Sequence, residues 1–136
     1  MKYTRTAVYT SVRAAILEEF PNAYCTSRYV PKPSAFPACY IHEIDNYKPI
    51  QYTQLDFKDV QHESVFEIQV ISNKIGTASA EAYAIMDIAK AEFQRLFYRE
   101  FTETNIDTGE TFTVVGRFRR VIGGGDEMPE EEEDNG

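Results

Sequence analysis

The feature that most limits how this chain can fold is an alternating apolar pattern followed closely by a long apolar stripe at helical spacing. Residues 63 to 72 alternate Phe66, Ile68 and Val70 with polar neighbours, the period of a strand with one buried side. Residues 77 to 101 carry a stripe with the period of a helix, formed by Ala82, Ile85, Met86, Ala89, Phe93, Leu96 and Phe97. We expect this helix, with Thr77 as its N-cap, to pack on the strand and form the core.

A shorter apolar stripe predicts a second helix over residues 4 to 20. Its members lie three or four residues apart or side by side: Val8, Val12, Ala15, Ile16 and Phe20. Pro21 is expected to end this helix, because proline lacks the backbone N–H and disfavours the helical conformation in the residue before it.

Two strands are expected between the two helices in addition to residues 63 to 72. Residues 23 to 30 and 38 to 44 are rich in β-forming residues. They are separated by three prolines within residues 31 to 37, which favour an extended chain without ladder hydrogen bonds.

A last strand is expected over residues 111 to 122, after a tight turn at residues 105 to 109. Gly116 is a candidate bulge on its buried face, which otherwise holds Phe112, Val114, Phe118 and Ile122. The element order predicts an α+β fold: a mixed or antiparallel sheet with two helices packed on one face, and a flexible acidic C-terminal tail. The other face, with Glu67, Gln69, Arg117 and Arg119, is expected to be partly open.

Charge divides the chain into a near-neutral body and an acidic end. Seven of the 22 acids lie in residues 126 to 136, which leaves fifteen acids against 14 bases in the rest. The domain is therefore expected to span residues 1 to 122, followed by a glycine-rich joint and acidic tail at 123 to 136. A near-neutral body argues against a strong nucleic-acid binder, which needs clustered Lys and Arg. Without a signal peptide or a long apolar run, a cytoplasmic protein is expected.

No residue pattern predicts a catalytic, cofactor or metal site. Cys25 and Cys39 are too few for a disulfide framework or a zinc site, and are expected to be reduced, half-buried thiols. No glycine-rich loop joins a strand to a helix in the manner of a phosphate cradle. His42 stands beside Glu43, as a general base would, but no nucleophile pattern accompanies it, and an ordinary surface histidine is favoured.

A metal cluster is a weaker alternative in residues 45 to 62 and just beyond. The acids and histidine there recur at roughly three-residue steps: Asp56, Asp59, His62 and Glu63. They would share one face of a helix, but Lys58 and a β-leaning context argue against a metal site.

Seven residues are candidate contacts between subunits or with partners: Tyr47, Tyr52, Phe57, Arg117, Arg119, Asp126 and Glu127. The three aromatics lie in a segment that is long for an idle loop in a compact domain. The two arginines alternate outward beside Arg120, and mark either a solvated sheet face or a partner contact, for example with the acidic tail of a neighbouring copy. The tail is either a solubilising extension, a contact for a basic partner, or a surface that repels nucleic acid.

The order of elements, together with Phe36-Pro37-Ala38 leading into Cys39-Tyr40-Ile41-His42, resembles the tail terminator proteins of long-tailed, lambda-like bacteriophages. In that family an N-terminal helix and a loop precede a strand introduced by a Phe-Pro-Ala step, and an alternating strand, a long helix and a final strand follow. The similarity covers roughly residues 4 to 122. The acidic tail departs from the pattern, and no functional residue is carried over.

The resemblance implies a non-enzymatic virion protein that assembles into a hexameric ring. Such a ring caps the tail tube, stops its growth and joins it to the head connector or head-completion protein. It also implies assembly in the host cytoplasm, a final place at the tail–head junction, no cofactor, no membrane, and a channel through which DNA passes without specific binding.

Three alternatives stay open. The first is another neck component, a head-completion or head–tail joining protein. The second is a small hydrolase that uses His42 or the set around Asp56, Asp59 and His62. The third is a ligand-binding module with an aromatic pocket of Tyr47, Tyr52 and Phe57.

Overall fold

The alternating pattern of residues 62 to 72 forms the central strand of a five-stranded sheet. The computed structural model describes residues 2–47, 62–123 and 125–129. Its elements are α1 (Arg5–Glu19), β1 (Tyr24–Thr26), β2 (Ala38–Tyr47), β3 (His62–Ser72), α2 (Ala78–Arg95), β4 (Arg99–Asp107) and β5 (Phe112–Ile122). The strand order is β1-β2-β3-β5-β4. Only the β1–β2 pair is parallel, so the sheet is mixed.

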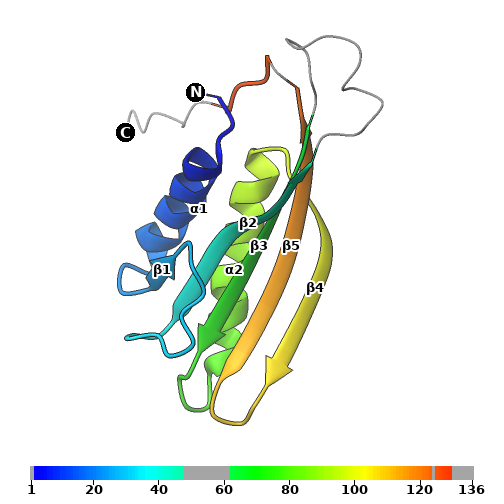
Figure 1. Ribbon diagram of the computed structural model, residues 1–136. Helices are drawn as coiled ribbons and strands as arrows, with labels where there is room; N and C mark the ends of the chain where they lie inside the picture. The colour runs from blue at the N-terminus through cyan, green and yellow to red at the C-terminus, as the bar shows by residue number, and fades with distance from the viewer. Residues whose placement is uncertain (1, 48–61, 124, 130–136) are drawn as a thin grey trace.

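Both helices cover the same face of the sheet (Figure 1), as the sequence predicts for an α+β fold. Val8, Val12 and Ile16 of α1 are buried, as are the predicted stripe residues of α2 up to Leu96. Phe93 of α2 stacks on Phe118 of β5, with ring centroids 4.4 Å apart and planes 12° apart. Burial of each such side chain contributes roughly 1.5–3 kcal/mol before entropy is subtracted.

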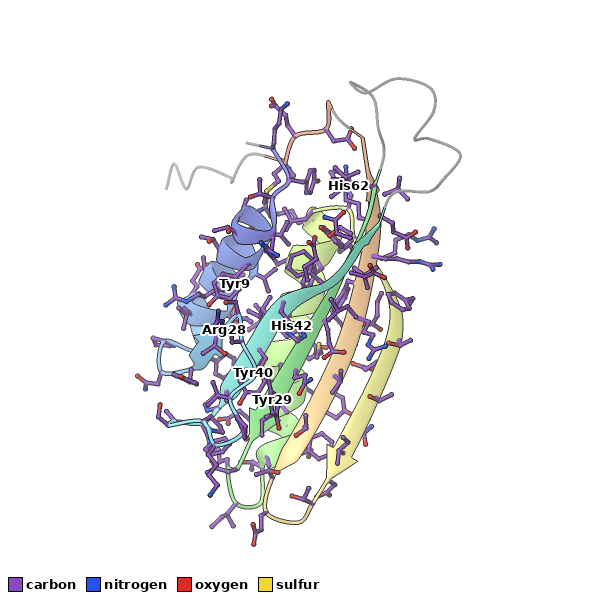
Figure 2. The ribbon with its side chains drawn as sticks, in the orientation of Figure 1. Tyr9, Arg28, Tyr29, Tyr40, His42 and His62 are labelled. Atoms are coloured by element: carbon purple, nitrogen blue, oxygen red, sulfur yellow. The ribbon has the colours of Figure 1, made fainter. Side chains whose placement is uncertain are left out.

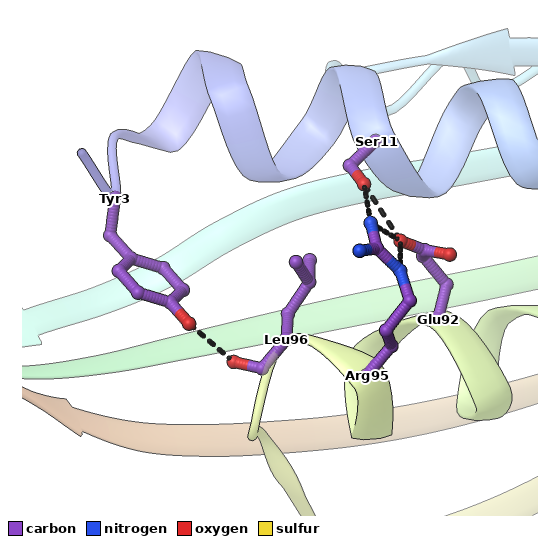
Figure 3. Close-up of polar contacts among 5 residues, drawn as sticks. All are labelled: Tyr3, Ser11, Glu92, Arg95 and Leu96. Atoms are coloured by element: carbon purple, nitrogen blue, oxygen red, sulfur yellow. Dashed lines mark hydrogen bonds and ion pairs between the residues drawn. The ribbon is translucent and has the colours of Figure 1, made fainter. Parts of the chain in front are cut away.

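Polar contacts join the two helices to each other (Figure 3). The Tyr3 hydroxyl, just before α1, donates to the Leu96 carbonyl at the end of α2, at 2.9 Å. The Ser11 hydroxyl of α1 donates to Glu92 Oε1 at 2.8 Å, and Arg95 pairs with the same carboxylate. These bonds fix the position of α1 along α2 on the sheet.

The long helix is shorter than the sequence predicts, and a strand follows it. α2 ends at Arg95, and the chain reverses at Phe97, whose φ of 66° is left-handed. The Phe97 and Tyr98 amides then donate to Gln94 O and Phe93 O, which forms a Schellman motif. Phe97 is therefore 64% exposed and is not part of the buried stripe. The expected helical residues 99 to 101 begin β4.

Other boundaries also differ from the sequence prediction. β1 has three residues where eight were expected, and β2 extends to Tyr47. Asn105 and Asp107 belong to β4, so the turn lies beyond them, at Gly109 with a φ of 85°. Thr77 holds the N-cap position of α2 without a side-chain capping hydrogen bond.

Gly116 is not a bulge. Its pairing with Ile68 continues the register of β3 and β5 without a shift. The irregularities lie in β2 between Glu43 and Asp45, and in β4 between Glu100 and Thr102. A Cβ on Gly116 would lie 3.2 Å from the Met86 sulfur, so the glycine allows α2 to approach the sheet closely.

Candidate interaction surface

The face of the sheet turned away from the helices, here called the outer face, has a covered half and an exposed half. On β2, Ala38 and Tyr40 are fully buried. The residues just before the proline-rich segment provide cover, since the Tyr40 hydroxyl donates to the Val30 carbonyl and the Tyr29 and Tyr40 ring centroids lie 5.2 Å apart (Figure 2). The predicted open face is thus open only towards β5 and β4.

A polar row on the outer face crosses three strands between these halves. Glu67 of β3 is 7% exposed and lies between His42 of β2 and Arg117 of β5 in the register. Arg117 Nε donates to Glu67 Oε2 at 2.8 Å, and Gln69 donates to Oε1 at 2.8 Å. His42 Nε2 lies 3.7 Å from Oε1 (His42 is labelled in Figure 2).

The row holds Glu67 in its charged form. Burial alone raises the pKa of the Glu67 carboxyl, but the hydrogen bonds from Gln69 and Arg117 outweigh it, and the pKa is lower than its ordinary value of 4.5. Arg117, a predicted partner contact, is therefore engaged within its own chain. The sequence neighbour of His42, Glu43, points to the helix side and accepts from Ser64 Oγ at 2.7 Å, so the two side chains do not form the pair that a general base would need.

The exposed half of the outer face belongs to β4 and β5. Every residue of β4 is exposed. Three large apolar side chains are also exposed there: Phe101 at 41%, Ile106 at 55% and Val121 at 53%. The Arg119 guanidinium lies 5.3 Å from the Phe101 ring centroid, so this predicted contact residue is at the surface.

A cluster that we call the basic corner lies where β4 begins. It consists of Phe97, Arg99, Arg119, Arg120 and Val121, and it lines a shallow hollow of about 480 Å³ together with Glu63. Arg99 and Arg119 stand directly opposite each other on β4 and β5. The helical stripe predicts that Phe97 and Arg99 lie in the long helix, so the sequence does not mark either residue as part of this surface.

The predicted contacts Asp126 and Glu127 are engaged within the molecule. Asp126 Oδ2 accepts from the Gly123 amide at 2.9 Å and pairs with Arg120 at 3.2 Å. Glu127 forms an isolated antiparallel bridge with Lys2. Met128 packs against the core, so this first part of the acidic segment is tied to the body of the domain.

The remaining candidates are only partly placed. Tyr47 is the last residue of β2, opposite Glu63, and His62 begins β3 opposite Ile122. Four candidates lie outside the described residues: Tyr52, Asp56, Phe57 and Asp59. Within the described ranges, no three His, Cys, Asp or Glu side chains are grouped as metal ligands would be.

The two cysteines are neighbours across the β1–β2 pair. Cys25 and Cys39 are register partners and both are free thiols. Cys39 is fully buried, where half-burial was expected. The hydrogen bond to Cys25, together with burial, holds the pKa of the Cys39 thiol well above its ordinary value.

The chain matches no protein-family model and no curated protein. In the part of the chain that the structure describes, no helix is long and apolar enough to cross a membrane.

Proposed function

We propose that the chain is a structural virion protein, a phage tail terminator whose copies form a hexameric ring. The ring caps the tail tube and joins it to the head connector or head-completion protein, after assembly in the host cytoplasm. The proposal assigns the chain no catalytic activity and no cofactor, and DNA passes through the ring without specific binding. Its basis is the resemblance in element order and in the Phe36-Pro37-Ala38 step that opens β2.

The observation that carries the proposal is the exposed half of the outer face. Among the described residues, β4 pairs with β5 on one side and has no strand on the other, because it is the last strand in the order. An edge strand offers unpaired N–H and C=O groups to another chain. Phe101 and Ile106 add apolar surface beside that edge. In a closed ring every copy presents two different surfaces to its neighbours, and the β4 edge supplies one of them.

The near-neutral body supports the channel role. With the acidic segment at 126 to 136 set aside, fifteen acids stand against 14 bases, and the whole chain carries a net charge of −8. A surface of this charge gives DNA phosphates few cations to bind, which suits a protein that DNA passes.

The test is the mass of the purified chain in solution, alone and mixed with a tail tube protein. A hexamer, or assembly into one on the end of the tube, is expected. Ile106→Asp should abolish assembly, whereas Ile44→Asp should not, because Ile44 is 40% exposed on β2, which is separated from β4 by β3 and β5 in the sheet. A persistent monomer that ignores the tube would favour a head-side neck protein or a ligand-binding domain.

A further inference from the structure

The sheet has a step at its β4 edge, at the basic corner. The pairing of β5 with β4 stops at Arg119, opposite Arg99. On its other side, β5 stays paired with β3 as far as Ile122. Among the described residues, Arg120, Val121 and Ile122 therefore have no strand beside them on the β4 side. The hollow of about 480 Å³ lies against this stretch and has room for a short piece of extended chain.

The charge at this step is unbalanced. Arg99 and Arg119 face each other directly, and like charges in that position repel. Within the described ranges neither guanidinium forms an ion pair, and the Arg119 guanidinium lies over the Phe101 ring. Arg120 Nε is buried without a hydrogen-bond partner among the described residues. The outer part of the corner, formed by Arg99 and Arg119, therefore lacks a counter-anion among the described residues, whereas Arg120 pairs with Asp126.

An apolar surface accompanies these charges. Phe97 is 64% exposed although it occupies the left-handed position at the end of α2, where glycine is the usual residue. Val121 is 53% exposed on the other side of the hollow. Arginines beside an exposed aromatic ring are typical of protein-binding surfaces.

We propose that the basic corner binds the acidic residues 130 to 134 of a second copy of this chain. These residues are four glutamates and one aspartate in succession. Guanidinium groups bind carboxylates through paired hydrogen bonds, so a run of acids supplies the anion that the corner lacks. This inference rests on the proposed function, because it needs assembled copies, and it names one contact between neighbours.

The course of the described chain favours a second copy over the same molecule. After β5, residues 125 to 129 cross towards the start of α1, whereas β4 lies at the opposite edge of the sheet (Figure 1). Asp126 pairs with Arg120 on the helix side of β5, and the Glu127–Lys2 bridge and the packing of Met128 keep this stretch on that side of the sheet. Arg99 and Arg119 point to the outer face instead, so the last described residues before the acidic run lie across the sheet from these two arginines.

Nucleic acid fits the corner less well. Three arginines form a small cluster, and Glu63 lines the same hollow. A phosphate backbone needs a track of cations, and the net charge of −8 opposes its approach.

The test uses a full-length chain whose own acidic run is neutralised by Glu→Gln at 130 to 133 and Asp134→Asn. A fluorescent synthetic peptide with the sequence of residues 126 to 136 is titrated against it, and anisotropy reports binding. We expect saturable binding that weakens with salt and falls about tenfold or more in Arg99→Gln/Arg119→Gln. The matched control is Arg5→Gln/Arg28→Gln, which removes two exposed charges elsewhere and should change the affinity less than about twofold.

Four outcomes would overturn the inference. The first two are no binding of the peptide, and a loss of peptide affinity in the control variant equal to that in Arg99→Gln/Arg119→Gln. The third is that a single-stranded DNA oligonucleotide binds more tightly than the peptide and depends on the same two arginines. The fourth is that the unmodified chain does not bind the peptide even at dilutions where its mass is that of a monomer. The last result would place the acidic run on its own corner. The mass of the unmodified chain, measured in parallel, separates the two proposals. If the unmodified chain is a hexamer but the neutralised chain does not bind the peptide, only this inference is contradicted. If the neutralised chain binds the peptide but the unmodified chain stays a monomer, the ring is contradicted.

Discussion

The two edges of the sheet are finished in opposite ways. At the β1–β2 edge, the chain covers itself: the segment before β2 lies over the outer face, and Tyr40 is completely buried beneath it. At the β4 edge, all nine residues of the strand are exposed, and Phe101 and Ile106 remain at the surface. The first edge contributes to the stability of the single chain, whereas the second is the surface that we propose for contact with another copy.

The core does not depend on the exposed edge. β4 adds length to the sheet, but the aromatic core joins α2 to β3 and β5 through Phe66, Phe93 and Phe118. Side chains on β4 contact α2 mainly through charges, with Lys90 Nζ lying 2.7 Å from Glu103 and 3.5 Å from Glu100. Exposed ion pairs of this kind contribute little, so β4 is held chiefly by its backbone pairing.

The largest expected difference between the edges concerns two aromatic residues. Tyr40→Ala should lower the free energy of unfolding by about 3–5 kcal/mol, because it opens a cavity under the covering segment. Phe101→Ala should lower it by less than about 1 kcal/mol, since only partial burial and the contact with Arg119 are lost. Urea unfolding of both variants checks the pair, and similar losses would mean that the two edges are equally important for stability.

An intermediate effect on the free energy of unfolding is expected at Glu67, which lies between the covered and exposed halves of the outer face. Glu67→Gln should lower the free energy of unfolding by about 1–3 kcal/mol near neutral pH, because Arg117 loses its charged acceptor. Folding lowers the pKa of Glu67, so its stabilising effect is present above 4.5 and is lost as the pH falls through the folded-state pKa. The two unfolding curves should therefore converge in acid.

The control for that variant is Glu110→Gln in the exposed β4–β5 turn. It should change the free energy of unfolding by less than about 0.5 kcal/mol at any pH where the chain is folded. A difference between wild type and Glu67→Gln that persists unchanged at low pH would contradict the charged role of Glu67.

The smallest effect is a gain in stability at the basic corner. Phe97→Gly should raise the free energy of unfolding by about 1 kcal/mol, because glycine adopts the left-handed conformation without the strain of a Cβ. Phe97→Ala keeps the Cβ and should give no gain. Thermal unfolding of the two variants distinguishes relief of backbone strain from loss of the Phe97 ring. Equal stabilities of Phe97→Gly and Phe97→Ala would show that backbone strain at this position does not affect stability.

The sequence predicts the core well because burial there follows simple periods. The alternation of Phe66, Ile68 and Val70 and the stripe around Ile85 and Phe93 mark the two faces that meet. Such patterns depend only on local spacing, so no tertiary knowledge is needed to find them.

β4 and the basic corner were missed for a physical reason. β4 has no buried face, so its sequence shows no apolar alternation, and the irregularity next to Phe101 interrupts its period. The stop of α2 carries no sequence signal either, because Phe97 stands where glycine is usual. The sequence consequently predicts a helical position for Arg99, where the structure has the first residue of β4.

The burial of Glu67 depends on residues that are distant in sequence. Its ion-pair partner Arg117 lies fifty positions away, and the two meet only after β3 and β5 pair in register. A polar residue on a predicted open face therefore gives no local sign that it is buried.

The central claim is that the β4 edge is the surface on which copies meet. Amide hydrogen exchange, followed strand by strand at a concentration where the chain is assembled and at a dilution where it is monomeric, tests it most directly. We predict that β4 amides become protected on assembly while those of β2 stay unchanged. An assembled ring in which β4 exchanges as fast as in the monomer would contradict the claim.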